Sequence, residues 1–161
     1  MKPIDFIRQA MVAAIYVAAC LALAPLSYGP IQFRFAEMLM ILPFFDKKYT
    51  IGLTVGCLLA NLLGPYGLPD IILGTFATFL ACFIISRLKQ KHLIAAVAAV
   101  INGLIIGLMI FVFYNEDGNF SFFAYSFLAS TIFIGEFVVV AIGTVLIYII
   151  EKNEYLQKVF K

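Results

Sequence analysis

The chain has 161 residues, of which 64% are hydrophobic and 12% are charged, with a formal net charge of +2 and a mean hydropathy of +1.06. Soluble domains are far less apolar, so the composition excludes an ordinary soluble globular protein and indicates an integral membrane protein. The small positive charge gives no support for nucleic-acid binding.

Six apolar runs follow one another and predict an all-α, polytopic membrane protein with six transmembrane helices. They lie at roughly 6–24, 35–45, 50–63, 70–86, 93–113 and 124–150. A helix needs about 20 residues to cross about 30 Å of hydrocarbon, so the second and third runs are short and must tilt or end inside a cavity. The segments between these apolar runs are rich in turn-forming and charged residues, and none is long enough to be a linker between two domains. We therefore expect residues 1–161 to form a single transmembrane domain.

The basic residues predict the orientation of these helices. If the N-terminus is cytoplasmic, all but one of the eleven Lys and Arg residues fall on the inner side. This distribution satisfies the positive-inside rule and places both termini in the cytoplasm. The exception is Arg34, which lies on the outer side, where the topology rule gives no reason for it.

The first apolar run also has features of a signal peptide. Lys2 and Arg8 precede or enter it, and the residues 22–24, "ALA", mimic a cleavage site. Pro25 directly after that site argues against cleavage, and five further apolar runs follow in either case. We therefore expect the first run to remain as a membrane helix.

Alanines recur every four residues along this first predicted helix, at Ala10, Ala14 and Ala18. Small side chains in such a ridge let two helices approach closely in a membrane, so this face predicts contact with another helix. Packing inside the same bundle is the alternative interpretation.

Several polar side chains are not explained by hydropathy. A charge at the centre of a membrane helix costs on the order of 2.5–3.5 kcal/mol on insertion scales, so such residues face the bundle interior or a wet cavity. The set consists of Gln32, Arg34, Glu37, Asn61, Asp70, Asn102 and Glu136. In the predicted topology, Asn102 and Glu136 lie deeper in the membrane. The other five residues gather at the outer ends of the second, third and fourth helices. Together they predict an outward-facing pocket.

Most of these residues also have a structural interpretation. Arg34 and Glu37 are spaced to pair with each other on a helix. Asp70 follows a Pro/Gly-rich segment and precedes a helix, as an N-cap residue does, and Asn102 beside Gly103 suits an interhelical hydrogen bond. Glu136 has apolar neighbours on both sides and no cation nearby in the sequence, which favours contact with a ligand.

The sequence offers little support for catalysis. It has neither a phosphate-binding G-x-x-x-x-G-K-[ST] loop nor an H-E-x-x-H motif, and its single histidine, His92, lies in a basic loop. The cysteines Cys20, Cys57 and Cys82 lie in apolar runs without metal-like spacing. We therefore expect no metal, no cofactor and no enzymatic activity, with a small membrane enzyme or a stand-alone carrier as the alternatives.

Two segments carry a resemblance to a known family. Residues 23–45, "LAPLSYGPIQFRFAEMLMILPFF", and residues 52–81, "GLTVGCLLANLLGPYGLPDIILGTFATFLA", closely resemble the QueT family. The distinctive motifs are "GPIQFR", "LLANLLG" and D-I-x-x-G-x-x-A-T. The resemblance is strong over roughly residues 8 to 90, and the second half agrees in length, helix count and the position of Glu136.

The resemblance implies a substrate-binding subunit for queuosine precursors within an energy-coupling factor transporter of a bacterial plasma membrane. Such a subunit is a single transmembrane domain that captures its substrate from outside. A shared membrane coupling protein and two cytoplasmic ATPases drive uptake, and an A-x-x-x-A face on the first helix docks the coupling protein. Ala10 and Ala14 fit that face, and Ala18 continues it.

The polar residues suit the chemistry of such a substrate. A 7-deazaguanine presents adjacent N–H donors that one carboxylate, Glu136 or Glu37, accepts together, and a carbonyl that an amide or arginine meets. Tyr28, Phe33 and Tyr66 lie near the same mouth and are candidates for stacking on the flat ring, with packing or interfacial anchoring as the alternative. A subunit of the same transporter class for a different vitamin-like solute is the second interpretation.

Overall fold

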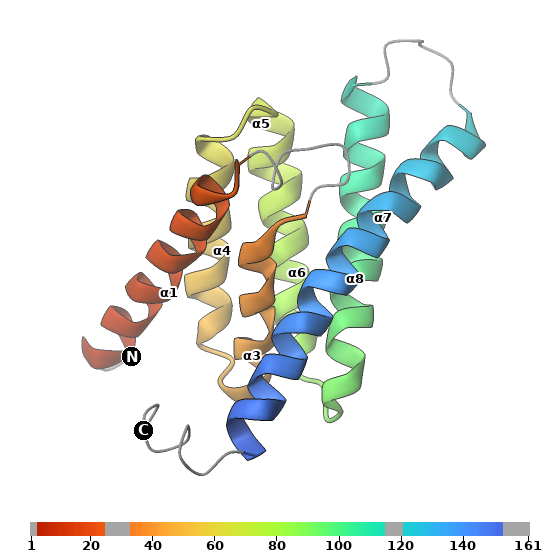
Figure 1. The fold of residues 1–161 in the computed structure, drawn as a ribbon. Helices are drawn as coiled ribbons and strands as arrows, with labels where there is room; N and C mark the ends of the chain where they lie inside the picture. Colours follow the sequence, from red (N-terminus) through yellow and green to blue (C-terminus); the bar gives the residue numbers. More distant parts are fainter. Residues whose placement is uncertain (1–2, 25–32, 115–120, 153–161) are drawn as a thin grey trace.

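Helices form almost all of residues 3–24, 33–114 and 121–152, which are the residues that this computed structural model describes, and these ranges contain no strand. The all-α prediction is confirmed. The elements in chain order are α1 (Pro3–Ala22), η1 (Phe35–Ile41), α3 (Leu42–Phe45), α4 (Tyr49–Leu62), α5 (Gly67–Pro69), η2 (Asp70–Gly74), α6 (Thr75–Ile85), η3 (Lys91–Leu93), α7 (Ile94–Tyr114) and α8 (Phe122–Lys152) (Figure 1).

These elements combine into six helical stretches that match the six apolar runs. In the described residues, four stretches are long and apolar enough to cross a membrane: Pro3–Ala22, Gly67–Ile85, Lys91–Phe113 and Phe122–Ile149. The stretches Phe35–Phe45 and Tyr49–Leu62 are apolar but shorter, as the lengths of the second and third runs predict. Apolar segments become helices in lipid because a helix satisfies its own backbone N–H and C=O groups.

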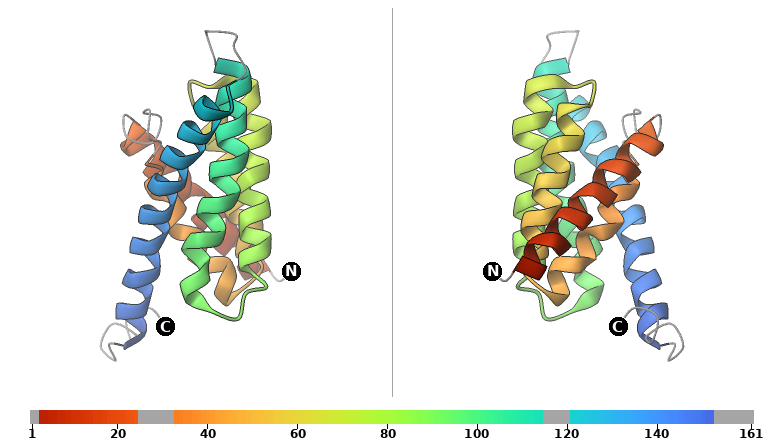
Figure 2. Two further views of the ribbon diagram at one scale, coloured as in Figure 1. Left: turned by 90° about the vertical axis from the view of Figure 1, so that its right-hand side faces the viewer. Right: turned by 90° about the vertical axis from the view of Figure 1, so that its left-hand side faces the viewer.

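The helices alternate in direction, so Pro3 at the start of α1 and Lys152 at the end of α8 lie at the same end of the bundle (Figure 1). Helices α4, α6 and α7 run roughly side by side, and α1 and α8 are inclined to them (Figure 2). Helix α1 packs on α4, and α8 packs on α7. The short helix η1 contacts α1, α6, α7 and α8, and this central place makes it the element around which the bundle closes.

Two glycines allow the inclined helices to approach closely. A Cβ added to Gly56 on α4 would lie 2.8 Å from the Cβ atom of Tyr16 on α1. A Cβ added to Gly143 on α8 would lie 2.5 Å from the backbone oxygen of Met38 in η1. Because real Cβ atoms do not come this close to other atoms, a larger residue at either position would push the helices apart.

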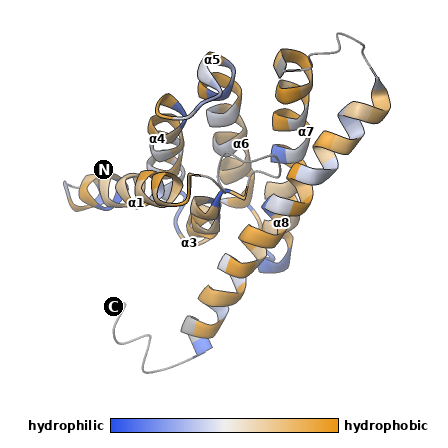
Figure 3. Cartoon of the chain, turned by 45° about the horizontal axis from the view of Figure 1, so that its top comes forward, coloured by the Kyte–Doolittle hydropathy of each residue, from blue (hydrophilic) through white to orange (hydrophobic). Residues whose placement is uncertain are grey.

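The outer surface of the bundle is strongly apolar. Large hydrophobic side chains such as Phe6, Leu63, Phe76 and Phe123 are more than half exposed, and Figure 3 shows hydrophobic residues along α7 and α8. Monomeric soluble proteins rarely expose apolar patches of this extent. Hydrocarbon is a solvent for such a surface, so the fold agrees with a membrane protein.

Candidate functional site

Four polar side chains predicted from the sequence meet around one small cavity inside the bundle. The cavity is lined by Arg34, Glu37, Asn102, Ile106, Ile132 and Glu136. Arg34 immediately precedes η1, Glu37 lies in η1, Asn102 lies on α7 and Glu136 on α8. The four polar residues are at most 6% exposed, so water does little to solvate their charges.

Arg34 forms an ion pair with Asp70, the first residue of η2. Its Nη2 atom lies 3.0 Å from Oδ1 and 2.9 Å from Oδ2 of Asp70, and Asp70 is fully buried. The predicted pairing of Arg34 with Glu37 is therefore wrong. The prediction assumes that residues three apart are neighbours on the surface of one helix. Arg34 is not helical: it has the angles φ −82° and ψ 89° at the cap of η1.

The N-cap interpretation of Asp70 is also wrong, because the helix that contains it already begins at Gly67. Residues Asp70–Gly74 form a wide π-type turn, a feature that often marks functional sites. The Nδ2 atom of Asn61 on α4 donates to the backbone carbonyl of Asp70 at 2.9 Å. Asn61 thus positions Asp70, which holds Arg34, and neither Asn61 nor Asp70 lines the cavity.

Glu37 is held by two hydroxyl groups that the sequence analysis did not assign to the site. Its Oε1 atom accepts hydrogen bonds from the hydroxyls of Tyr16 on α1 and Thr78 on α6. Tyr16 lies in a run read as purely apolar, although a buried tyrosine hydroxyl usually requires a partner. Thr78 is the last residue of the motif D-I-x-x-G-x-x-A-T. Its place in this motif is the sequence feature that could have indicated a role for Thr78 in the site.

Glu136 accepts a hydrogen bond of 2.8 Å at Oε1 from the Nδ2 atom of Asn102. This bond joins α7 to α8, so the structural interpretation of Asn102 as an interhelical contact holds. Asn102 and Glu136 also line the cavity, and the two interpretations are therefore compatible.

Two polar atoms of residues that line this cavity lack a hydrogen-bond partner among the described residues. They are Nε of Arg34, a donor, and Oε2 of Glu37, an acceptor, and both are buried. Buried polar groups are nearly always paired, and an unpaired one costs about 1–3 kcal/mol. A polar ligand beside these two residues would satisfy the unpaired donor and the unpaired acceptor.

The remaining predicted residues lie elsewhere. Gln32 and Tyr28 fall outside the described residues. Phe33 and Tyr66 are half-buried and do not line the cavity. Ala10, Ala14 and Ala18 are exposed on α1, whereas the adjacent Ala13 is buried close to Gly56 of α4. The predicted ridge therefore faces away from its own bundle, and the alternative of internal packing is wrong.

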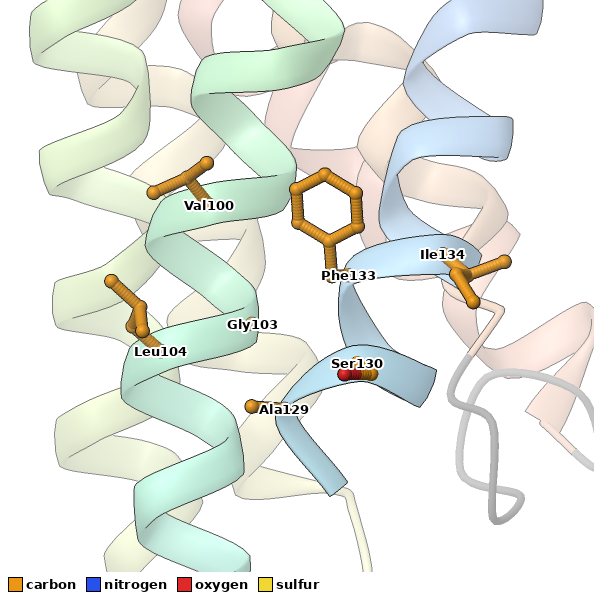
Figure 4. A pocket seen from close by; sticks show the side chains of 7 residues that line it. All are labelled: Val100, Gly103, Leu104, Ala129, Ser130, Phe133 and Ile134. Atoms are coloured by element: carbon orange, nitrogen blue, oxygen red, sulfur yellow. The ribbon is translucent and has the colours of Figure 1, made fainter. Parts of the chain in front are cut away.

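A wider hollow, of about 410 Å³, lies between α7 and α8 (Figure 4). Its lining consists of Val100, Gly103, Leu104, Ala129, Ser130, Phe133 and Ile134. The hydroxyl of Ser130 already donates to the carbonyl of Ser126 at 2.7 Å. This groove offers no charge with which to orient a polar ligand, so the small polar cavity is the better candidate site.

No group of three or more His, Cys, Asp or Glu side chains in the described ranges is arranged to hold a metal ion. The lining of the cavity supplies one guanidinium, two carboxyl groups and one amide, which can recognise a ligand by hydrogen bonds and charge.

The comparisons with known proteins agree on one family. A family model described as "QueT transporter" matches residues 6–152. The curated "Queuosine precursor transporter QueT" of Lactococcus lactis subsp. cremoris (strain MG1363) is 39% identical over 97 residues, which are 56% of this chain and 57% of that relative. The aligned part thus spans little more than half the length of the relative. No solved structure matches the chain.

The ion pair between Arg34 and Asp70 should contribute strongly to stability. Because Asp70→Asn leaves the Arg34 charge buried without its partner, the free energy of unfolding should fall by about 3–5 kcal/mol. Replacing both residues by apolar ones, Arg34→Met with Asp70→Leu, should restore part of that loss. Thermal unfolding in detergent measures both effects.

The ion pair between Lys48 and Asp5 provides the control, since the Lys48 side chain is 42% exposed. Lys48→Met should change the melting temperature little, because solvent screens such a pair. Equal losses for Asp70→Asn and Lys48→Met would contradict the structural role of the buried pair.

Proposed function

Because this chain belongs to the QueT transporter family, we propose that it is the membrane-embedded substrate-binding subunit of an energy-coupling factor transporter and binds a queuosine precursor of the 7-deazaguanine class. The family match confirms the resemblance inferred from the sequence motifs. The substrate agrees with the name of the relative from Lactococcus lactis. In this proposal residues 1–161 form one substrate-binding domain in a bacterial cell membrane.

The observation that carries the proposal is the cavity with its unpaired donor on Arg34 and its unpaired acceptor on Glu37. A 7-deazaguanine has a carbonyl acceptor beside an N–H and an amino group that both donate. The Glu136 carboxylate, with four lone-pair sites and one Asn102 bond, can accept both donors. The Arg34 Nε–H then donates to the carbonyl.

The cavity must widen to admit this ligand. About 10 Å³ inside it is open to the centre of a water molecule, which is roughly the space that one water needs. A bicyclic base is much larger. We therefore propose that η1 and α8, which carry Glu37 and Glu136, separate when the substrate enters.

The orientation proposed is with both termini in the cytoplasm. The loops at the end of the bundle that holds Pro3 carry Lys47, Lys48, Arg87 and Lys89. Residues 63–66 at the opposite end carry no charge. The positive-inside rule therefore favours placing the end near Asp70 outside the cell, where the subunit would meet its substrate.

The exposed ridge of Ala10, Ala14 and Ala18 supports a docking role for α1. Small residues at a helix surface permit the close approach that stabilises helix pairs in membranes. We propose that the membrane coupling protein binds this ridge and that two cytoplasmic ATPases drive the uptake.

The proposed contact of Glu136 with the ligand can be tested by Glu136→Gln. The change keeps the shape of the side chain but replaces one acceptor oxygen by a donor, so affinity for a 7-deazaguanine precursor should fall about tenfold to hundredfold. Calorimetry on the folded variant measures this. Ser130→Ala in the α7–α8 groove is the control and should bind normally. Unchanged affinity in Glu136→Gln, or a loss confined to Ser130→Ala, would refute the proposed site.

The docking ridge can be tested by Ala14→Trp. Added bulk should abolish copurification with the coupling protein and ATPases and stop uptake, while substrate binding by the isolated subunit persists. Val145→Trp places the same bulk on an exposed position of α8 and should have no effect. Normal complex formation by Ala14→Trp would show that the coupling protein docks on a different surface.

The orientation can be tested with a reporter that is active only in the cytoplasm. Fused after Lys161 it should be active, and inserted at Gly118 it should be inactive. The reverse result would place the polar cavity toward the cytoplasm and would rule out capture from outside.

A further inference from the structure

A stripe of phenylalanine side chains runs along the outward face of α6. Phe76, Phe79 and Phe83 are 51%, 41% and 41% exposed, and their spacing of three and four residues places them on one side of the helix. The rings of Phe79 and Phe83 are neighbours, with centroids 5.9 Å apart. In a membrane this face of α6 lies against lipid acyl chains, and none of the three rings lines the polar cavity.

Arg87 lies at the end of this stripe and is held there by its neighbours. Its Cζ atom lies 3.4 Å from the centre of the Phe83 ring, which is a cation–π contact. Its Nη1 atom donates to the carbonyl of Phe83 at 2.8 Å and to the hydroxyl of Ser86 at 3.4 Å. Because these contacts already order the exposed side chain, an anion that binds the guanidinium causes little further loss of entropy.

The guanidinium of Arg87 retains donors for such an anion. Within the described part of the chain, Nη1 is the atom of this group that donates hydrogen bonds. A guanidinium has five N–H groups, so those on Nε and Nη2 are available to an acceptor outside the protein. Phosphate suits them well, since its oxygens accept two parallel N–H groups at once.

The depth of Arg87 in the membrane determines which phosphate can reach it. The apolar stretch that contains α6, Gly67–Ile85, has 19 residues, so its length is close to the ~30 Å of a hydrocarbon core. Arg87 comes shortly after the end of this stretch, at the level of the lipid headgroups. The phenylalanine stripe descends from there into the acyl region. A phospholipid has its phosphate and its acyl chains at these same two levels.

The charges near Arg87 favour an anionic phospholipid over a zwitterionic one. Lys89 is exposed in the same loop and adds a second positive charge. Asp5 and Asp46, which lie at the same end of the bundle (Figure 1), are both bonded to Lys48. Each basic side chain near the membrane surface strengthens the attraction of anionic lipid, whereas the headgroup of a zwitterionic lipid carries its own cation.

We propose that Arg87 and the phenylalanine stripe of α6 form a binding site for an anionic phospholipid. The lipid phosphate binds the guanidinium, and one acyl chain lies along the rings of Phe83, Phe79 and Phe76. The site depends on the location of the chain in a membrane and not on the substrate, so it stands whether or not the polar cavity binds a 7-deazaguanine.

The site can be tested with a fluorescent reporter. The chain contains no tryptophan, so Phe83→Trp introduces a single one, and tryptophan keeps the cation–π contact. The purified full-length variant is placed in vesicles of phosphatidylcholine with a minor share of phosphatidylglycerol. In one preparation the phosphatidylglycerol carries bromine on its acyl chains, and in the other an equal amount of phosphatidylcholine carries it. Bromine quenches tryptophan on contact, and the quenching should show that phosphatidylglycerol binds about threefold to tenfold more strongly.

Arg87→Gln, combined with Phe83→Trp, should abolish this preference, so that both brominated lipids quench equally. Arg8→Gln is the matched control, because it removes one positive charge from an exposed residue at the same end of the bundle and should leave the preference unchanged. Phe113→Trp reports a second exposed surface, at the far end of α7, and should be quenched equally by both lipids.

Three results would overturn the proposal. Equal quenching of Phe83→Trp by both brominated lipids would show that α6 is an ordinary lipid-exposed face. An equal loss of preference in Arg87→Gln and Arg8→Gln would show a diffuse attraction to the whole basic end of the bundle. Quenching by neither lipid would show that a second copy of the chain covers this face.

Discussion

The buried ion pair between Arg34 and Asp70 is the interaction on which the rest of the site depends. A guanidinium in the interior of an apolar bundle needs a carboxylate beside it, and this need places the start of η1 against the π-type turn at Asp70. Because η1 then contacts α1, α6, α7 and α8, Glu37 comes within reach of Tyr16 and Thr78. The same pair compensates the charge of Arg34 inside the bundle.

Much of this architecture can be predicted from the sequence because a membrane leaves few choices. Apolar runs must become helices in hydrocarbon, and polar residues within them must face inward. That logic correctly brings together Arg34, Glu37, Asn102 and Glu136, which come from distant parts of the chain. Three short motifs in the sequence also indicate the family.

The pairing of these residues could not be predicted in the same way. The spacing of Arg34 and Glu37 indicates a helical pair, yet Arg34 lies just before the helix, and its partner is 36 residues away. The π-type turn that presents Asp70 has no signal in hydrophobic periodicity. Tyr16 was missed because a hydropathy scale averages its apolar ring with its hydroxyl, and only the hydroxyl reaches Glu37.

The narrowness of the cavity has a consequence for the kinetics of capture. A protein whose site is closed binds only from the fraction of molecules that open, so its apparent dissociation constant exceeds the intrinsic one by the inverse of that fraction. Association is then slower than diffusional encounter and levels off at high substrate concentration, where the opening rate limits it. The contacts between η1 and α8, such as the close approach of Gly143 to Met38, would then set how fast a ligand can enter the cavity.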